Sequence, residues 1–153
     1  MIPFWNAGSG SRDVAPSTPS ATFRWPIRVY YEDTDAAGVV YYANYLKFLE
    51  RARTEWLRAL GFEQDALRQQ YGLVFAVRKA EITYLSPALF NDRLMVTATV
   101  ARCGRAGLDF RQEIARDEDG RCCVRAEVSI ACVRLSDWRP ARIPDQLLEK
   151  IAQ

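Results

Sequence analysis

Apolar residues recur at helical spacing in the first half of the chain, at steps of three or four positions. Side chains at these steps lie on one face of an α-helix, and the positions between them are mostly charged. We therefore expect a long amphipathic helix over about 41–60, ended by Gly61, and a shorter helix over 63–71. The apolar face consists of Tyr45, Leu49, Ala52, Trp56 and Leu60.

After position 72 the pattern changes to the alternation of a β-strand. In residues 93–102, for example, Leu94 and Val96 alternate with Met95 and Thr97. Strands are expected over 23–31, 73–85, 93–102, 108–114 and 122–135.

The connections between the last four strands suit an antiparallel sheet, and residues 117–120 form a hairpin turn. Pro26 favours an edge position for the first strand, because proline lacks the N–H that a central strand needs. An early helix followed by consecutive strands predicts an α+β fold, with the helix on one face of a five-stranded antiparallel sheet.

The chain is expected to form one domain over residues 23–153. Residues 1–22 are rich in small residues, proline and serine, so we expect a disordered N-terminal extension. No apolar run is long enough to span a bilayer, and no signal peptide is apparent. These features predict a globular protein of the cytoplasm.

Charge and composition exclude several kinds of chemistry. The 21 basic and 19 acidic residues give a net charge of +2, which provides no reason to expect a nucleic-acid partner. The chain contains no histidine, which excludes Ser-His-Asp and Cys-His catalysis and histidine-ligated zinc. Acid–base catalysis is therefore left to Asp, Glu, Lys, Tyr or Cys.

The four cysteines form no metal-binding motif. None of them makes a C-x-x-C pair, and adjacent residues of a strand point to opposite faces, so Cys122 and Cys123 should lie on opposite sides of the sheet. We expect free thiols that pack as small apolar residues, and no metal. The other two are Cys103 and Cys132.

The strongest chemical signal is an acidic turn between the first strand and the long helix. Asp33 and Asp35 precede Gly38, and the helix begins shortly afterwards. A helix start offers unpaired N–H groups and a positive dipole end, so it can stabilise developing negative charge. A carboxylate beside such a site could attack an activated acyl group, although an aspartate here is also a common turn or capping residue.

Two segments carry a resemblance to a known family: residues 31–41 (YEDTDAAGVVY) and residues 44–57 (NYLKFLERARTEWL). Both closely resemble acyl-CoA thioesterases of the hotdog superfamily, and most of all the Tol-Pal-associated group, which is related to 4-hydroxybenzoyl-CoA thioesterase. The resemblance extends over about residues 24–145. It implies the hotdog fold, in which the sheet wraps around a central helix, and thioester hydrolysis without a metal or cofactor.

The resemblance also implies roles for residues in the turn. Asp35 would carry the chemistry, either by activating water or by attacking the thioester carbonyl, and backbone N–H groups around Tyr41 and Tyr42 would stabilise the oxyanion. Asp33 would have an orienting or capping role and would not take part in the chemistry directly. Gly38 would allow an unusual backbone conformation or a close approach. The remaining supporting residues are Asn44, which would either hold the turn or be exposed, and Tyr41, Tyr42 and Tyr45, which would line a pocket or pack in a dimer.

One position differs from many relatives. Many members of the Tol-Pal-associated group have histidine where this chain has Tyr42, whereas the 4-hydroxybenzoyl-CoA enzyme also has tyrosine. A backbone donor is independent of the side chain, so the difference bears on substrate preference. Tyr42 could instead contact the acyl group or donate its hydroxyl.

Coenzyme A carries phosphates, for which arginine is well suited. Candidates near strand ends are Arg102, Arg105, Arg139 and Arg142. The family resemblance further implies a homodimer or homotetramer with the active site between subunits, and an exposed sheet edge favours such assembly.

Two alternatives to the thioesterase remain. A hotdog dehydratase normally uses a histidine, which this chain lacks. A non-catalytic module could bind acyl-CoA or acyl carrier protein, or serve as a scaffold peripheral to the inner membrane.

Overall fold

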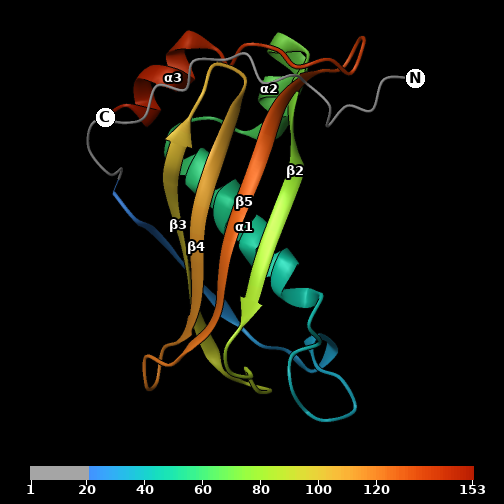
Figure 1. Cartoon of the computed structure of the whole chain (residues 1–153), viewed down its shortest axis with the longest axis vertical. Coiled ribbons are helices and arrows are strands. Elements are labelled where there is room, and N and C mark those ends of the chain that lie inside the picture. Colours follow the sequence, from blue (N-terminus) through green and yellow to red (C-terminus); the bar gives the residue numbers. More distant parts are fainter. Residues whose placement is uncertain (1–20) are drawn as a thin grey trace.

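The computed structural model describes residues 21–153, so all but the last two residues of the predicted extension (1–22) lie outside the described part. Figure 1 shows the arrangement of the elements. In chain order they are β1 (Phe23–Arg28), the 3-10 helix η1 (Tyr31–Asp33), α1 (Asn44–Ala59), α2 (Gln64–Tyr71), β2 (Leu73–Tyr84), β3 (Arg93–Cys103), β4 (Gly107–Arg116), β5 (Cys122–Arg134) and α3 (Asp145–Ile151).

The five strands form one antiparallel sheet in the order β1-β3-β4-β5-β2. The predicted α+β fold with a five-stranded antiparallel sheet is therefore confirmed. Pro26 lies in β1 at one edge of the sheet, as its missing N–H required. The other edge is β2, which is twice as long and contains no proline. No helix within residues 21–153 is long and apolar enough to cross a bilayer.

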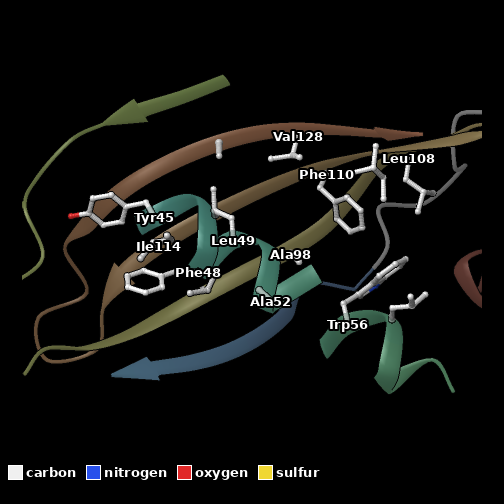
Figure 2. Packing of buried hydrophobic residues seen from close by; sticks show 14 of the residues in the cluster. Tyr45, Phe48, Leu49, Ala52, Trp56, Ala98, Leu108, Phe110, Ile114 and Val128 are labelled. Atoms are coloured by element: carbon white, nitrogen blue, oxygen red, sulfur yellow. The ribbon is translucent and has the colours of Figure 1, made fainter. Parts of the chain in front are cut away.

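α1 packs against the sheet through the face that the sequence spacing predicted. Tyr45, Leu49, Ala52 and Trp56 are buried, and Figure 2 shows them turned toward side chains of the sheet such as Phe110. Two residues beside this stripe, Phe48 and Leu57, are also buried, so the apolar face is wider than predicted. The helix contacts β1 and β3 directly.

The largest differences from the predicted element boundaries, three positions each, fall at the acidic turn. β1 ends at Arg28 instead of position 31, because the N–H of Asp33 donates to the carbonyl of Tyr30 (3.0 Å) and folds this segment into η1. α1 begins at Asn44 instead of position 41. The chain before it is held in isolated β-bridges as far as Val40, which pairs with Thr34. The N–H of Tyr41 then donates back to the carbonyl of Asp33 (2.9 Å), and residues 42 and 43 form a turn ahead of the helix.

One polar side chain is fully buried between helix and sheet. Gln112 of β4 donates to the carbonyls of Leu49 and Thr97 (both 3.1 Å) and accepts from Nη1 of Arg53 (2.9 Å). Burial lowers the pKa of Arg53. Residues of α1 and β3 therefore supply hydrogen-bond partners for both the oxygen and the nitrogen of this buried amide. These bonds fix the position of α1 along the sheet.

The thiols lie as the strand alternation predicted. Cys123 is fully buried, whereas its neighbour Cys122 is partly exposed, and all four cysteines are free. Burial raises the pKa of Cys132 to about 11 and also raises those of Cys103 and Cys123. The buried thiols are therefore neutral near pH 8.

We expect Ellman's reagent at pH 8 to modify at most two thiols in the native protein, Cys103 and Cys122, and all four in guanidinium chloride. At that pH only about one in a thousand Cys132 side chains would be thiolate, the form that reacts. Rapid reaction of three or more thiols without denaturant would contradict the burial described here.

Candidate active site

The acidic turn lies at the end of the sheet where α1 begins, and it is closed by its own backbone. The N–H of Asp35 donates to the carbonyl of Val39 (2.9 Å), and that of Gly38 donates to the carbonyl of Asp35 (3.0 Å). Gly38 has φ +80°, and a Cβ there would meet nothing within 4 Å. The glycine is therefore needed for its backbone conformation and not for a close approach.

Asp33 lies inside the turn and connects its two sides. Its side chain is buried, with 9% of the residue exposed, and its Oδ2 accepts the N–H of Tyr30 (2.8 Å). Its carbonyl accepts the N–H of Tyr41 and the side-chain Nδ2 of Asn44, both at 2.9 Å. Asp33 and Asn44 together hold the start of α1 against η1.

Asp35, in contrast, is exposed. Its Oδ1 accepts the N–H of Ala37 (2.9 Å), which fixes the side chain in an Asx turn. No donor within residues 21–153 reaches its Oδ2. One carboxylate oxygen is therefore held in place, and the other is available to a water molecule or a substrate.

The start of α1 provides two backbone N–H groups without an acceptor. The N–H of Tyr41 donates to Asp33, and that of Asn44 donates to the carbonyl of Tyr41 (2.8 Å). Between them, the N–H groups of Tyr42 and Ala43 have no acceptor within residues 21–153. The amides expected around Tyr41 and Tyr42 are therefore narrowed to those of Tyr42 and Ala43, because the N–H of Tyr41 is already paired. The sequence did not name Ala43, since nothing in a residue type distinguishes a free amide.

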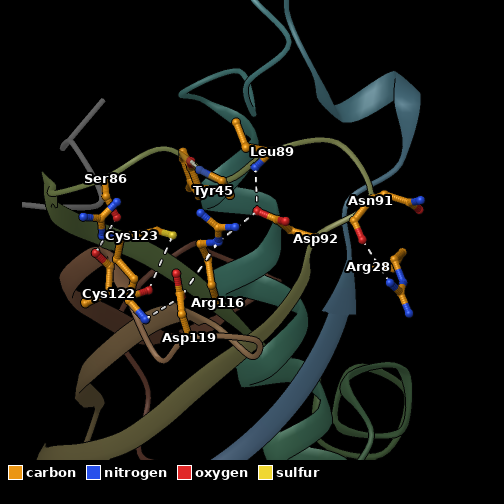
Figure 3. A network of polar contacts seen from close by, with 12 residues as sticks. Arg28, Tyr45, Ser86, Leu89, Asn91, Asp92, Arg116, Asp119, Cys122 and Cys123 are labelled. Carbon is orange, nitrogen blue, oxygen red and sulfur yellow. Dashed lines mark hydrogen bonds and ion pairs between the residues drawn. The ribbon is translucent and has the colours of Figure 1, made fainter.

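A loop on the other side supports the turn. The N–H of Val40 donates to the carbonyl of Ala88 (2.9 Å), and Val39 pairs with Leu89. Figure 3 shows how Asp92 holds this loop: its Oδ2 accepts the N–H of Leu89 (2.8 Å) and lies 3.3 Å from Nε of Arg116 in an ion pair. The position of the acidic turn therefore depends on the ends of β3 and β4.

The four candidate arginines lie together, but at the opposite end of the sheet. Arg102 and Arg105 belong to the β3–β4 hairpin, and Arg139 and Arg142 follow β5 close to it, since the N–H of Ile143 donates to the carbonyl of Arg105 (2.7 Å). In Figure 1 this hairpin is near α3, far from the start of α1. Strands of this length separate the two ends by roughly 30 Å. Within one chain, these arginines cannot serve the acidic turn.

Residues 29–151 match the family model of the thioesterase-like superfamily. The chain is 43% identical to the acyl-CoA thioesterase YbgC of Haemophilus influenzae over 82% of this chain and 90% of that protein. It is 41% identical to the acyl-CoA thioester hydrolase YbgC of Escherichia coli, over 86% and 96% respectively. The chain belongs to the YbgC family of this superfamily.

The fold of this YbgC-family chain is also that of solved thioesterases. A 1,4-dihydroxy-2-naphthoyl-CoA thioesterase from Synechocystis superimposes with a TM-score of 0.81 at 26% identity, covering 87% of this chain and 97% of that one. The hotdog architecture that the resemblance implied is confirmed. No group of side chains within residues 21–153 is arranged to hold a metal ion.

The three tyrosines near the start of α1 in this YbgC-family protein differ in their exposure to solvent. Tyr41 and Tyr42 are exposed and in ring contact (4.9 Å between centroids), and the Tyr42 phenol raises the pKa of Tyr41. Tyr45 is only 3% exposed and its hydroxyl accepts the N–H of Ala88 (3.1 Å), so it belongs to the core of its own chain. Burial raises its pKa. Only the first two face solvent.

The two aspartates should differ in their effect on stability. We expect Asp33→Ala to lower the free energy of unfolding by about 1–3 kcal/mol, because it removes a buried carboxylate and the part-buried hydrogen bond that this group accepts from the N–H of Tyr30. Asp35→Ala should cost less than about 1 kcal/mol, because the residue is exposed. Urea unfolding followed by circular dichroism measures both, and equal losses would contradict the separation of roles.

Proposed function

We propose that this protein hydrolyses the thioester of an acyl-CoA to a carboxylic acid and CoA, and that Asp35 carries the reaction. The observation that supports this most directly is the Oδ2 of Asp35, which is free of donors from residues 21–153 and lies in the same turn as the N–H groups of Tyr42 and Ala43, which are unpaired within those residues. YbgC proteins of Haemophilus influenzae and Escherichia coli are named as an acyl-CoA thioesterase and an acyl-CoA thioester hydrolase, which supports the substrate class.

Each part of the turn then has a role. Asp35 either removes a proton from an attacking water or itself adds to the thioester carbonyl. The carbonyl oxygen becomes negatively charged as the tetrahedral intermediate forms, and N–H groups at the start of α1 would stabilise it. The C–S bond then breaks, and the CoA thiolate takes up a proton. If water is the nucleophile, this step gives the acid directly; if Asp35 is the nucleophile, it gives an acyl–Asp35 anhydride, which a water molecule then hydrolyses to the acid and the free carboxylate. Asp33, Gly38 and Asn44 would keep the turn in shape.

We expect Asp35→Asn and Asp35→Ala to lower kcat by about 10²–10⁴-fold, because either change removes the base or nucleophile. Glu32→Gln, at an exposed acidic neighbour in η1, should remain within about twofold of wild type and serves as the matched control. Steady-state hydrolysis of a panel of acyl-CoA thioesters, followed by release of the CoA thiol, measures the effect.

The outcomes of this experiment separate the alternatives. Unchanged turnover in both Asp35 variants would contradict the role of Asp35. Absence of wild-type turnover on every acyl-CoA would favour the non-catalytic binding module. After a single turnover in ¹⁸O-labelled water, label in the Asp35 carboxylate would show covalent attack followed by addition of water to the Asp35 carbonyl carbon, because a general base acquires no label.

We further propose that two copies pair along their β2 edges. This edge strand is long and largely exposed from Val77, itself 49% exposed, to Tyr84, whereas the other edge contains Pro26. A two-fold axis centred near Ala80 would pair the strands antiparallel and place Lys79 of each copy opposite Glu81 of the other. The result would be a continuous ten-stranded sheet.

This pairing would also bring the arginines of one copy close to the acidic turn of the other. Antiparallel pairing turns one copy end over end, so the arginine end of each chain lies beside the acidic turn of the other. Arg102, Arg105, Arg139 and Arg142 would then contact the phosphates of a CoA whose thioester lies at the Asp35 of the partner. An acyl-carrier-protein partner and a location in the cytoplasm stay predictions.

Subunit mixing tests this arrangement. We expect Arg105→Ala with Arg139→Ala to raise KM about tenfold or more and Arg24→Ala, an exposed arginine of β1, to leave it unchanged. Mixing the double variant with Asp35→Ala should restore, at low acyl-CoA, up to about a quarter of wild-type activity, since each mixed dimer contains one intact site. Mixed dimers that form, as native mass spectrometry can show, without any recovery would contradict shared sites.

A further inference from the structure

We infer that Tyr84 is a positioning residue for this reaction: its hydroxyl holds the Tyr42–Ala43 peptide so that the Ala43 N–H acts as a second oxyanion donor beside that of Tyr42. The inference rests on the proposed thioesterase function and assigns a part of its machinery. Tyr84 is the last residue of β2, and 42 positions separate it from Tyr42.

The central contact is a hydrogen bond between a strand and a helix start. The Tyr84 hydroxyl donates to the carbonyl oxygen of Tyr42 (3.1 Å). The Tyr84 ring also contacts the Tyr42 ring edge-on (6.2 Å between centroids) and the buried Tyr45 ring (5.8 Å). The pairing of Tyr84 with Val124 of β5 holds its backbone. The phenol is therefore supported from the sheet and from the core.

The Tyr42 carbonyl has no other donor within residues 21–153. A helix would normally supply the N–H of Leu46, but that group donates to the carbonyl of Ala43 (3.2 Å). The N–H of Asn44 donates to the carbonyl of Tyr41. Without the Tyr84 hydroxyl, no hydrogen bond of the described chain would fix the plane of the Tyr42–Ala43 peptide.

The geometry of a peptide group links this carbonyl to the free amide. The structure contains no cis peptide in the described chain, and in a trans peptide the C=O and N–H point in opposite directions. Holding the Tyr42 carbonyl toward Tyr84 therefore aims the Ala43 N–H away from Tyr84. Accepting a hydrogen bond at the carbonyl also polarises the amide and strengthens its N–H as a donor.

The preceding peptide has the same arrangement. The Tyr41 carbonyl is held by the N–H of Asn44, and the N–H of Tyr42 at the other end of that peptide has no acceptor among the described residues. Two successive peptides thus have a fixed carbonyl and an unpaired amide. Consecutive amides of this kind form an anion-binding site, and the second of them depends on Tyr84.

Tyr84→Phe is the decisive variant, because it keeps the ring and removes only the hydroxyl. We expect kcat to fall about 10- to 100-fold while KM changes less than about twofold. Tyr31→Phe is the matched control: Tyr31 is an exposed tyrosine at the same end of the molecule, and its hydroxyl makes no hydrogen bond within the described residues. It should retain wild-type kcat.

Two inhibitors distinguish positioning from a general structural effect. An acyl-CoA trifluoromethyl ketone, which forms a charged tetrahedral adduct, should bind Tyr84→Phe more weakly by about the same factor as the loss of kcat. A CoA thioether that lacks the carbonyl should bind wild type and variant equally. Equal weakening of both inhibitors, or wild-type kcat in Tyr84→Phe, would overturn the inference while leaving the thioesterase in place. A wild-type protein that hydrolyses no acyl-CoA would overturn the proposed function and this inference with it.

Discussion

The packing of one face of α1 against the sheet is the constraint on which the rest of this structure depends. It buries Tyr45, Phe48 and Leu49 in the first turns of the helix, and so determines where the helix starts. The Tyr45 hydroxyl accepts the N–H of Ala88, which fixes the loop that pairs with the acidic turn. The amides at this helix start cannot move to reach acceptors, because the buried side chains and the Tyr45–Ala88 hydrogen bond fix the backbone around them.

The acidic turn divides two tasks between two neighbouring aspartates. Asp33 accepts hydrogen bonds from backbone and side-chain donors through its carboxylate and its carbonyl, whereas one carboxylate oxygen of Asp35 accepts none from the part of the chain that the structure describes. Such a division suits catalysis, since a reactive group must stay available while its surroundings stay rigid. The rigid residue is buried and the available one is exposed, so burial is the property that separates them.

The two ends of the sheet have different characters. One end carries the acidic turn and a group of tyrosines, and the other carries the β3–β4 hairpin and the arginines. A single chain keeps these ends apart, and an antiparallel pair of chains would bring them together. The proposed dimer uses the long β2 edge, which has no neighbouring strand within residues 21–153, and would supply each acidic turn with the arginines that its own chain holds at the far end.

Much of this protein can be read from the order of its residues. Four features are local: the helical spacing in α1, the alternation in β3, the edge position of Pro26 and the positive φ of Gly38. The two patterns predict a helix and a strand because each has its own side-chain period, and the two single residues predict their positions through their own backbone chemistry. The sequence of the acidic turn also identified Asp33 and Asp35 as candidate site residues. Only the tertiary structure decided which carboxylate is buried, which amides are unpaired and where the arginines lie. Those features depend on contacts between residues far apart in the chain, such as Tyr84 with Tyr42, and the spacing of residues within one segment has no information about them.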